Sequence, residues 1–196
     1  MMSRAAAHLE KLAIETFSVV LGVLLALAAN AWHDARGHKQ SACESLRAIR
    51  AELTSNDSVL RAKLPYHEAM NDSLLALLGR THGPVVPKGL RAIANWSGLS
   101  PAQWLDDAWQ TTRSTQNIQY LPYAVAIQLS RAYAAQQRIS DESRGFYAAV
   151  YTPAFATGGV SAIAAMQSFL GDLKSNEEHL QTQLDTTLAR TQQYCR

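Results

Sequence analysis

An uncharged stretch near the N-terminus constrains this chain more than any other feature of its sequence. No Asp, Glu, Lys or Arg lies between Glu15 and Asp34. As a helix, residues 13–32 would be about 30 Å long at ~1.5 Å per residue, which matches the hydrocarbon core of a bilayer. The sequence therefore predicts a transmembrane anchor at residues 13–32, preceded by a short flank (residues 1–12) and followed by a helical domain (residues 33–196).

The sequence allows two other interpretations of this stretch. One is a buried core helix, although such helices rarely extend this far without a charged residue. The other is a cleaved signal peptide, because Arg4 and Lys11 precede the apolar run and residues 29–31 form an A-x-A pattern. Two features argue against cleavage: Glu15 lies at the head of the run, and helical periodicity continues past the pattern.

Small and polar residues recur along one face of the predicted anchor. We call them the anchor stripe: Glu15, Ser18, Gly22, Ala26 and Asn30. Small residues let two helix backbones approach closely, and a polar side chain in lipid favours a partner. The stripe therefore predicts binding to a second copy of the chain or to another membrane protein. The alternative is that Gly and Ala are simply common in membrane helices.

The anchor also resembles a known pattern, that of a family of uncharacterised bacterial single-pass membrane proteins. The similarity lies in Glu15, the run GVLLAL at residues 22–27, Asn30, Trp32 and Asp34. The sequence departs from that pattern at Ile14, where the family has Gly, and at Ala29, where it often has a larger residue. A second, weaker resemblance covers residues 109–133, which end in AIQLSRAY. The resemblance implies membrane attachment and a helical domain, without an established activity.

The charges that flank the anchor conflict with this resemblance over orientation. Two basic residues precede the anchor (Arg4 and Lys11) and four follow it closely (Arg36, Lys39, Arg47 and Arg50). Taken alone, this excess favours a cytoplasmic domain. The resemblance to a signal anchor and the placement of the cysteines favour export. We expect a single-pass protein of the bacterial inner membrane with a periplasmic helical domain.

The rest of the chain has helical periodicity and predicts an all-α bundle. The apolar stripe continues as a stalk helix to about Lys63, and Pro65 is expected to end that helix or to start the next. A short second helix is expected to stop at Gly79, before a loop at residues 80–89. Three further helices are expected. One begins at Ser100, which forms a capping box with Gln103 and is followed by Pro101 in the first turn. The other two run from about Leu121 to Tyr151 and from Ile163 to Leu188.

The chain has two cysteines, too few for a disulfide framework or a cysteine zinc site. Cys43 lies at the membrane end of the stalk, and Cys195 follows the apolar stripe of the last helix. If the last helix packs antiparallel to the stalk, the two cysteines meet. A disulfide would then stabilise the fold by roughly 2–5 kcal/mol in an oxidising compartment. The alternative is two ordinary thiols.

The sequence contains no motif for chemistry. The 18 basic and 16 acidic residues give a net charge of +2, which lacks the footprint of a nucleic-acid binder. No nucleotide motif is present, and the six histidines form no metal-ligand pattern. We interpret Asp34 and His38 as a solvated pair. The adjacent Asp106 and Asp107 would point in different directions on a helix, so they make a poor acid–base pair. We therefore expect no catalytic residue, no metal and no cofactor.

An aromatic cluster is the one feature that favours a binding site in the helical domain. Its candidate residues for a pocket or an interface are Trp104, Trp109, Arg113 and Asn117, although such tryptophans are more often core. The preferred function is a membrane-anchored helical scaffold, assembly or accessory protein without catalytic activity. The alternative is a sensor domain of the cell envelope that encloses a small apolar ligand near Trp104 and Trp109.

Overall fold

The computed structural model describes residues 2–80, 97–152, 155 and 159–195, with only the backbone described for residues 2–13. Its elements are α1 (Met2–Gly79), α2 (Asp107–Ser114), the 3-10 helix η2 (Asn117–Tyr120), α3 (Tyr123–Val150) and α5 (Val160–Thr191). The described part of the chain contains no β-strand. The fold is therefore all-α, as predicted. The expected loop at residues 80–89 lies almost entirely outside the described residues.

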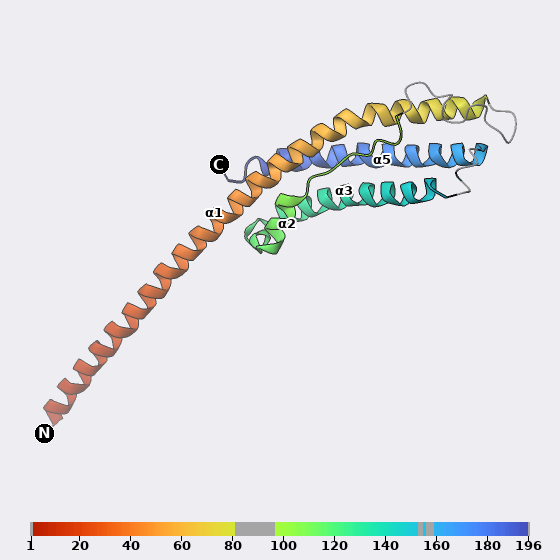
Figure 1. The fold of residues 1–196 in the computed structure, drawn as a ribbon. Coiled ribbons are helices and arrows are strands. Elements are labelled where there is room, and N and C mark those ends of the chain that lie inside the picture. The colour runs from red at the N-terminus through yellow and green to blue at the C-terminus, as the bar shows by residue number, and fades with distance from the viewer. Residues whose placement is uncertain (1, 81–96, 153–154, 156–158, 196) are drawn as a thin grey trace.

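Helix α1 is a single uninterrupted helix that passes through Pro65. The prediction that Pro65 would end or start a helix is therefore wrong. Proline removes one backbone hydrogen bond and costs a helix interior about 3 kcal/mol. Tertiary packing offsets this cost, because Leu60 and Met70 are buried in the core on either side of the proline. Figure 1 shows α1 continuing along the whole length of the bundle with a gentle curve.

The bundle consists of the C-terminal half of α1 together with α3 and α5, which lie side by side (Figure 1). Helix α5 is antiparallel to α1, as the ion pairs between Arg61 and Asp185 and between Glu68 and Lys174 show. The predicted apolar stripe of α5 is confirmed: its last member, Leu188, is partly buried against the core, and the others are fully buried, namely Ile163, Met166, Leu170, Leu173, Leu180 and Leu184. They pack with buried leucines of α1 and α3, including Leu46, Leu53, Leu60 and Leu129.

The chain returns along α1 before it enters α3. Residues 97–106, which we call the return segment, have no helix, so the predicted helix start at Ser100 is wrong. Ser100 has a φ of 43°, outside the range of a right-handed helix, and α2 begins only at Asp107. Gly98, with a φ of 86°, adopts a conformation that only glycine takes readily. Local capping signals were overridden here by contacts to α1.

Polar side chains on one face of α1 hold the return segment in place. Tyr66 donates from its hydroxyl to the carbonyl of Gly98 at 2.6 Å, and Lys63 donates to the Ser100 hydroxyl at 2.7 Å. Asn56 forms a two-way bond with the backbone of Leu105: its Nδ2 donates to the carbonyl at 2.8 Å, and its Oδ1 accepts from the backbone N–H at 2.9 Å. Asn56, a polar residue between the buried Leu53 and Leu60 of α1, therefore binds the backbone of the return segment.

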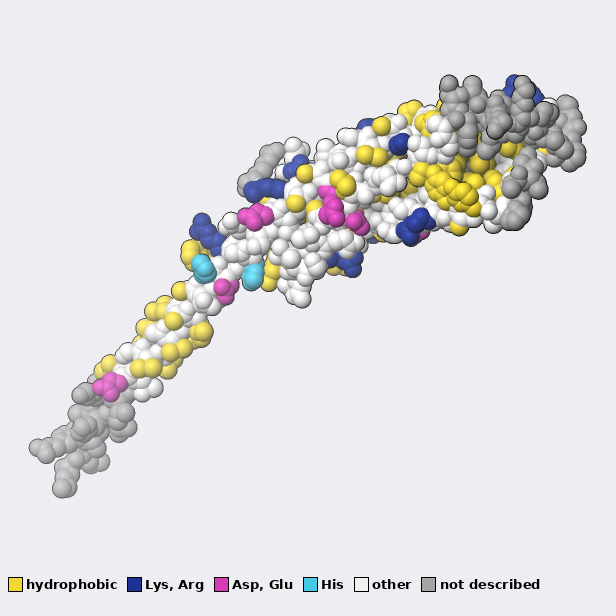
Figure 2. All heavy atoms as spheres, in the orientation of Figure 1, with side chains coloured by type: hydrophobic (Ala, Val, Ile, Leu, Met, Phe, Trp, Pro, Cys, Tyr) yellow, Lys and Arg dark blue, Asp and Glu magenta, His cyan; other side chains and the backbone are white. Residues whose placement is uncertain are grey.

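The N-terminal part of α1 extends away from the bundle (Figure 1). This helix is long and apolar enough to cross a membrane, with a mean hydropathy of 1.9 over its most apolar window and none of that window buried. Figure 2 shows hydrophobic side chains around this protruding part and charged side chains where it meets the bundle. The alternative of a buried core helix is therefore wrong for residues 14–32. Helix α1 also continues without a break across the A-x-A pattern.

Candidate functional site

The anchor stripe lies on the protruding part of α1, and all five of its side chains are exposed. Ser18 donates to the carbonyl of Ile14 at 2.7 Å, and Asn30 donates to the Asp34 carboxylate at 3.2 Å. A Cβ added to Gly22 would meet no atom within 4 Å. Two polar members of the stripe are therefore bonded within the helix, and the space around Gly22 is open.

The junction between the protruding helix and the bundle is lined by polar and aromatic side chains. Arg36 lies over the ring of Trp32, with its Cζ 5.7 Å from the ring centroid. His38 stacks on Tyr120 at a centroid distance of 4.0 Å, so its partner is Tyr120 rather than Asp34. The end of η2 is thereby placed against α1 at the base of the bundle.

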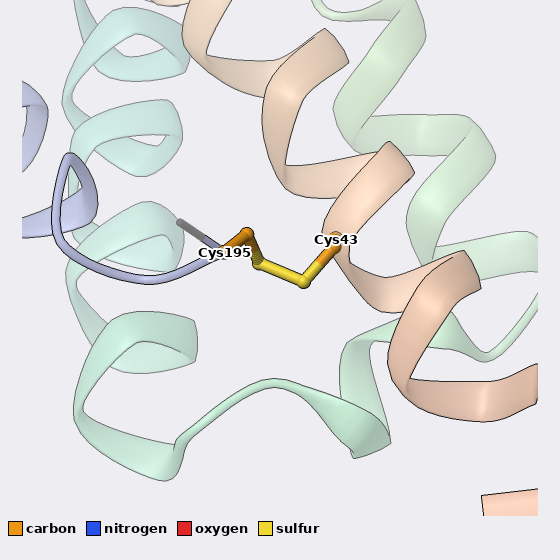
Figure 3. The surroundings of a disulfide bond; sticks show 2 residues. All are labelled: Cys43 and Cys195. Carbon is orange, nitrogen blue, oxygen red and sulfur yellow. A yellow bond between two sulfur atoms is a disulfide. The ribbon is translucent and has the colours of Figure 1, made fainter. Parts of the chain in front are cut away.

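Cys43 and Cys195 form a disulfide at the same end of the bundle (Figure 3). Their Cα atoms lie 5.5 Å apart, and 152 residues separate them in sequence. The bond joins α1 to the short tail that follows α5. Antiparallel packing of α5 on α1 brings the two cysteines together, as the sequence predicted for the bridged alternative.

Three of the four candidate pocket residues line one groove between α2 and α3. The groove has a volume of about 450 Å³, and Trp104, Trp109 and Arg113 are in its walls. Asn117 lies elsewhere, because its Nδ2 donates to the Ser45 hydroxyl of α1 at 3.1 Å. The structure therefore brings three of the four candidate residues together in one groove, whereas Asn117 is a contact between η2 and α1.

Trp109 belongs to both the groove and the core. It is 6% exposed and stacks on Tyr133 with the ring centroids 5.0 Å apart. The Arg113 guanidinium lies 5.9 Å from the Trp109 ring centroid, within the range of a cation–π contact. Trp109 is therefore a core residue that also lines the groove.

A buried carboxylate supports the floor of the groove. Glu52 of α1 accepts hydrogen bonds from the Tyr133 hydroxyl and from the backbone N–H of Ala108, the latter at 2.8 Å. Burial, and then the hydrogen bond to Glu52, raises the pKa of Tyr133 above its ordinary value. Folding therefore keeps this phenol protonated, and α1, α2 and α3 are joined at one point.

This raised pKa predicts a loss of stability at alkaline pH. Above pH 10 an unfolded tyrosine releases its proton while folded Tyr133 keeps it, so unfolding becomes more favourable by about 1.4 kcal/mol per pH unit. Equilibrium unfolding between pH 9 and 11 should show this slope reduced in Tyr133→Phe. Tyr123→Phe, at an exposed position of the same helix, should keep the wild-type slope. Equal slopes in all three proteins would contradict the prediction.

A second buried polar pair was not predicted from the sequence. His67 of α1 and Glu177 of α5 are both fully buried, with Nδ1 2.8 Å and 3.0 Å from the two carboxylate oxygens. His67 Nε2 donates to the carbonyl of Leu99 in the return segment at 2.9 Å. Since both ring nitrogens face acceptors, a proton must also lie between Nδ1 and the carboxyl group. The pair thus ties α1, α5 and the return segment together.

A signal for this pair is present in the sequence. Glu177 occupies a position in the apolar stripe of α5, between Leu173 and Leu180, and His67 lies between Leu60 and Leu74 on α1. A charged or polar residue within each of two packed stripes indicates mutual pairing. The described residues contain no group of three or more His, Cys, Asp or Glu that could hold a metal ion.

These features define the class of the protein: a helical bundle carried on a long, exposed apolar helix and closed at its base by a disulfide. No protein-family model, curated protein or solved structure matches the chain.

Proposed function

We propose that the protein is a membrane-anchored helical scaffold, assembly or accessory protein that acts without catalysis. The observation that carries this proposal is the continuity of α1, which joins an exposed apolar segment to the core of the bundle without a break. Such a helix fixes the bundle to the anchor. A domain held in this way is suited to presenting a surface to a partner at a set distance from the membrane.

The chemistry of the buried groups supports a role without catalysis. The buried carboxylates Glu52 and Glu177 bind Tyr133, the backbone of Ala108 and His67. These contacts hold helices and the return segment together, and neither carboxylate lines the groove. General acid–base catalysis needs titratable groups that can reach a substrate. These buried groups are instead bonded within the fold.

The proposal places the chain once across the inner membrane of a bacterium, with the bundle in the periplasm. The disulfide supports this orientation, because disulfides persist in oxidising compartments. The resemblance of the anchor to bacterial single-pass proteins supports it as well. The four basic residues after Trp32 favour the opposite orientation, so a direct test is required.

Labelling of the cysteines in intact cells provides that test. We expect a membrane-impermeant thiol reagent to label the protein only after reduction, because the disulfide occupies both thiols until then. The intact mass should correspond to an uncleaved anchor. A protein that resists labelling after reduction, but whose thiols react on lysis, would place the bundle in the cytoplasm. A shortened mass would indicate a cleaved signal peptide.

The anchor stripe is proposed to bind a second copy of the chain or another membrane protein. Gly22→Ile adds a branched side chain where a partner helix would approach, and should abolish the anchor-driven oligomer on a membrane-compatible gel. Val20→Ile is the matched control, because residue 20 is about 200° around the helix from residue 22. An oligomer unchanged by Gly22→Ile would exclude the stripe as the contact surface.

The groove favours a second candidate function, a sensor domain that binds a small ligand. Its volume of about 450 Å³ lies within the usual range for such sites, about 300–1,000 Å³. The lining includes charged and amide side chains, so the ligand differs from the apolar one suggested by the tryptophans alone.

A further inference from the structure

The base of the bundle has an exposed surface of aromatic and basic side chains next to the apolar segment. It lies where the protruding part of α1 meets η2 and the first turn of α3 (Figure 1). We call it the base surface: Trp32, Arg36, Lys39, Tyr120 and Tyr123. Trp32 is 65% exposed, Tyr120 40% and Tyr123 81%. Because Trp and Tyr side chains gather at the boundary between water and lipid, this composition is typical of a membrane contact.

The height of the base surface above the apolar segment matches the headgroup layer of a bilayer. That layer is about 5–7 Å thick on each side of the hydrocarbon core. The backbone of Lys39 is about 10 Å further along α1 than that of Trp32, and the side chains of a helix lean towards its N-terminus, which here is the lipid side. Arg36 shows this reach, because its Cζ lies 5.7 Å from the centroid of the Trp32 ring. Both basic side chains can therefore reach the phosphate groups.

Helix η2 places the two tyrosines close to the same level. The Tyr120 ring stacks on His38, and Asn117 is bonded to Ser45, so η2 is fixed to α1 at two points. Helix α3 begins at Tyr123 and runs away from the anchor (Figure 1), so the side chain of Tyr123 also leans towards the lipid. Membrane helices tilt by about 20° on average. A tilt of α1 towards η2 would lower both tyrosines into the headgroup layer.

The charge of the base surface favours an anionic partner. Neither Arg36 nor Lys39 forms an ion pair within the described part of the chain. Asp34, the one acidic residue among residues 33–41, accepts a hydrogen bond from Asn30. Figure 2 shows basic and histidine side chains where the protruding helix meets the bundle. We propose that the base surface binds the headgroups of anionic phospholipids in the leaflet from which α1 emerges, and that this contact tilts α1 towards η2. The proposal rests on the proposed membrane anchor.

A fluorophore on the first turn of α3 tests the contact in the full chain. Ala124→Cys, beside Tyr123, supplies a thiol for labelling, because the disulfide occupies both native cysteines. The chain is reconstituted into vesicles of phosphatidylcholine, alone or mixed with phosphatidylglycerol, which contain a trace of lipid with a nitroxide quencher on its headgroup. Phosphatidylglycerol should increase the quenching at residue 124, and high salt should reverse the increase. Ala148→Cys is the matched control: residue 148 is also an exposed alanine of α3, about 36 Å further along the helix, and its quenching should not depend on lipid charge.

Three variants connect the contact to the base surface. A basic residue close to an anionic bilayer strengthens binding about fivefold, so Arg36→Gln with Lys39→Gln should lower the docking equilibrium in the mixed vesicles about tenfold or more. Arg131→Gln with Arg138→Gln removes the same charge from exposed positions further along α3, and should behave like the wild type. Tyr123→Ser should weaken the quenching in both kinds of vesicle, because the aromatic contact does not require lipid charge.

The outcomes separate this inference from the proposed anchor. A chain that floats with the vesicles, but whose quenching at residue 124 is the same with and without phosphatidylglycerol, would overturn the inference and leave the anchor intact. Equal losses from the two double variants would also overturn it, because the effect would then follow the total charge of the chain. A chain that does not float with the vesicles would overturn both the anchor and the inference.

Discussion

Reduction of the Cys43–Cys195 disulfide is expected to lower the free energy of unfolding by about 2–5 kcal/mol. The bond joins residues 152 positions apart, so it closes almost the whole bundle into one loop and restricts the unfolded chain. In the chain-entropy account, long loops give the largest stabilisation. Denaturation by urea in mild detergent, followed by tryptophan fluorescence, measures the effect. Fluorescence is preferable to helix content because buried Trp109 reports on the bundle, and Trp32→Phe, present in every protein compared, removes the tryptophan of the anchor.

The double variant Cys43→Ala and Cys195→Ala is the control for this experiment. It should unfold like the reduced wild type, and a reducing agent should have no further effect on it. The single variant Cys43→Ala should lose as much stability as the double variant. A wild-type protein whose midpoint is insensitive to reduction would contradict a structural role for the bond.

Replacement of His67 by Ala is expected to cost about 3–5 kcal/mol, because it leaves the carboxyl group of Glu177 buried without its partner. The change also removes the donor to the Leu99 carbonyl, which is one of several bonds that hold the return segment on α1. The same urea experiment measures the loss. An exposed histidine on α5 offers a control, since His179→Ala should change the free energy of unfolding by less than about 0.5 kcal/mol.

A double-mutant cycle separates the pair from its surroundings. Replacing both residues by leucine removes the two polar groups together, so His67→Leu with Glu177→Leu should be more stable than either single variant. The Leu99 carbonyl still loses its donor in the double variant, which sets a limit on the recovery. Additive losses from the two single changes would contradict direct pairing.

The helices that could be predicted from the sequence are those whose burial follows a regular spacing. Helix α5 has apolar residues at steps of three and four, and most of these residues are buried. The predicted boundaries of α3 also agree with the structure, because Pro122 stands directly before its first residue, Tyr123. Antiparallel packing of two such stripes was enough to anticipate that Cys43 and Cys195 can meet.

The predictions that failed depended on local signals that tertiary contacts override. Pro65 breaks an isolated helix, but α1 continues because residues on both sides of the proline pack against the bundle. Ser100 and Pro101 have the composition of a helix start, yet the return segment is bonded to side chains of α1. Those bonds join residues more than 30 positions apart, as from Tyr66 to Gly98, and no local pattern reveals them.

The candidate site could be predicted only in part, because some of its residues are close together in sequence and others meet only through tertiary contacts. The tryptophans marked the region, because large aromatic residues close together in sequence remain close together in space. Gln136, which also lines the groove, is only 3% exposed, and no signal in the sequence indicates this because a glutamine within a helical stretch is ordinarily exposed. Its burial depends on how α2 and the return segment lie against α3, which follows from the contacts to α1 at Glu52 and Asn56.

Because α1 is unbroken, the direction in which the bundle faces around the helix axis is fixed by the orientation of the anchor. A straight helix advances by about 100° and ~1.5 Å per residue, and residues 33–41 connect the apolar segment to the first buried position, Ala42. One residue added there would turn the groove by more than a quarter of a revolution about the axis of the apolar segment, and would move it along that axis by only ~1.5 Å. If two anchors pair through Gly22, the directions in which their bundles face are thereby set as well. Any rotation of the apolar segment about its own axis would therefore turn the bundle with it.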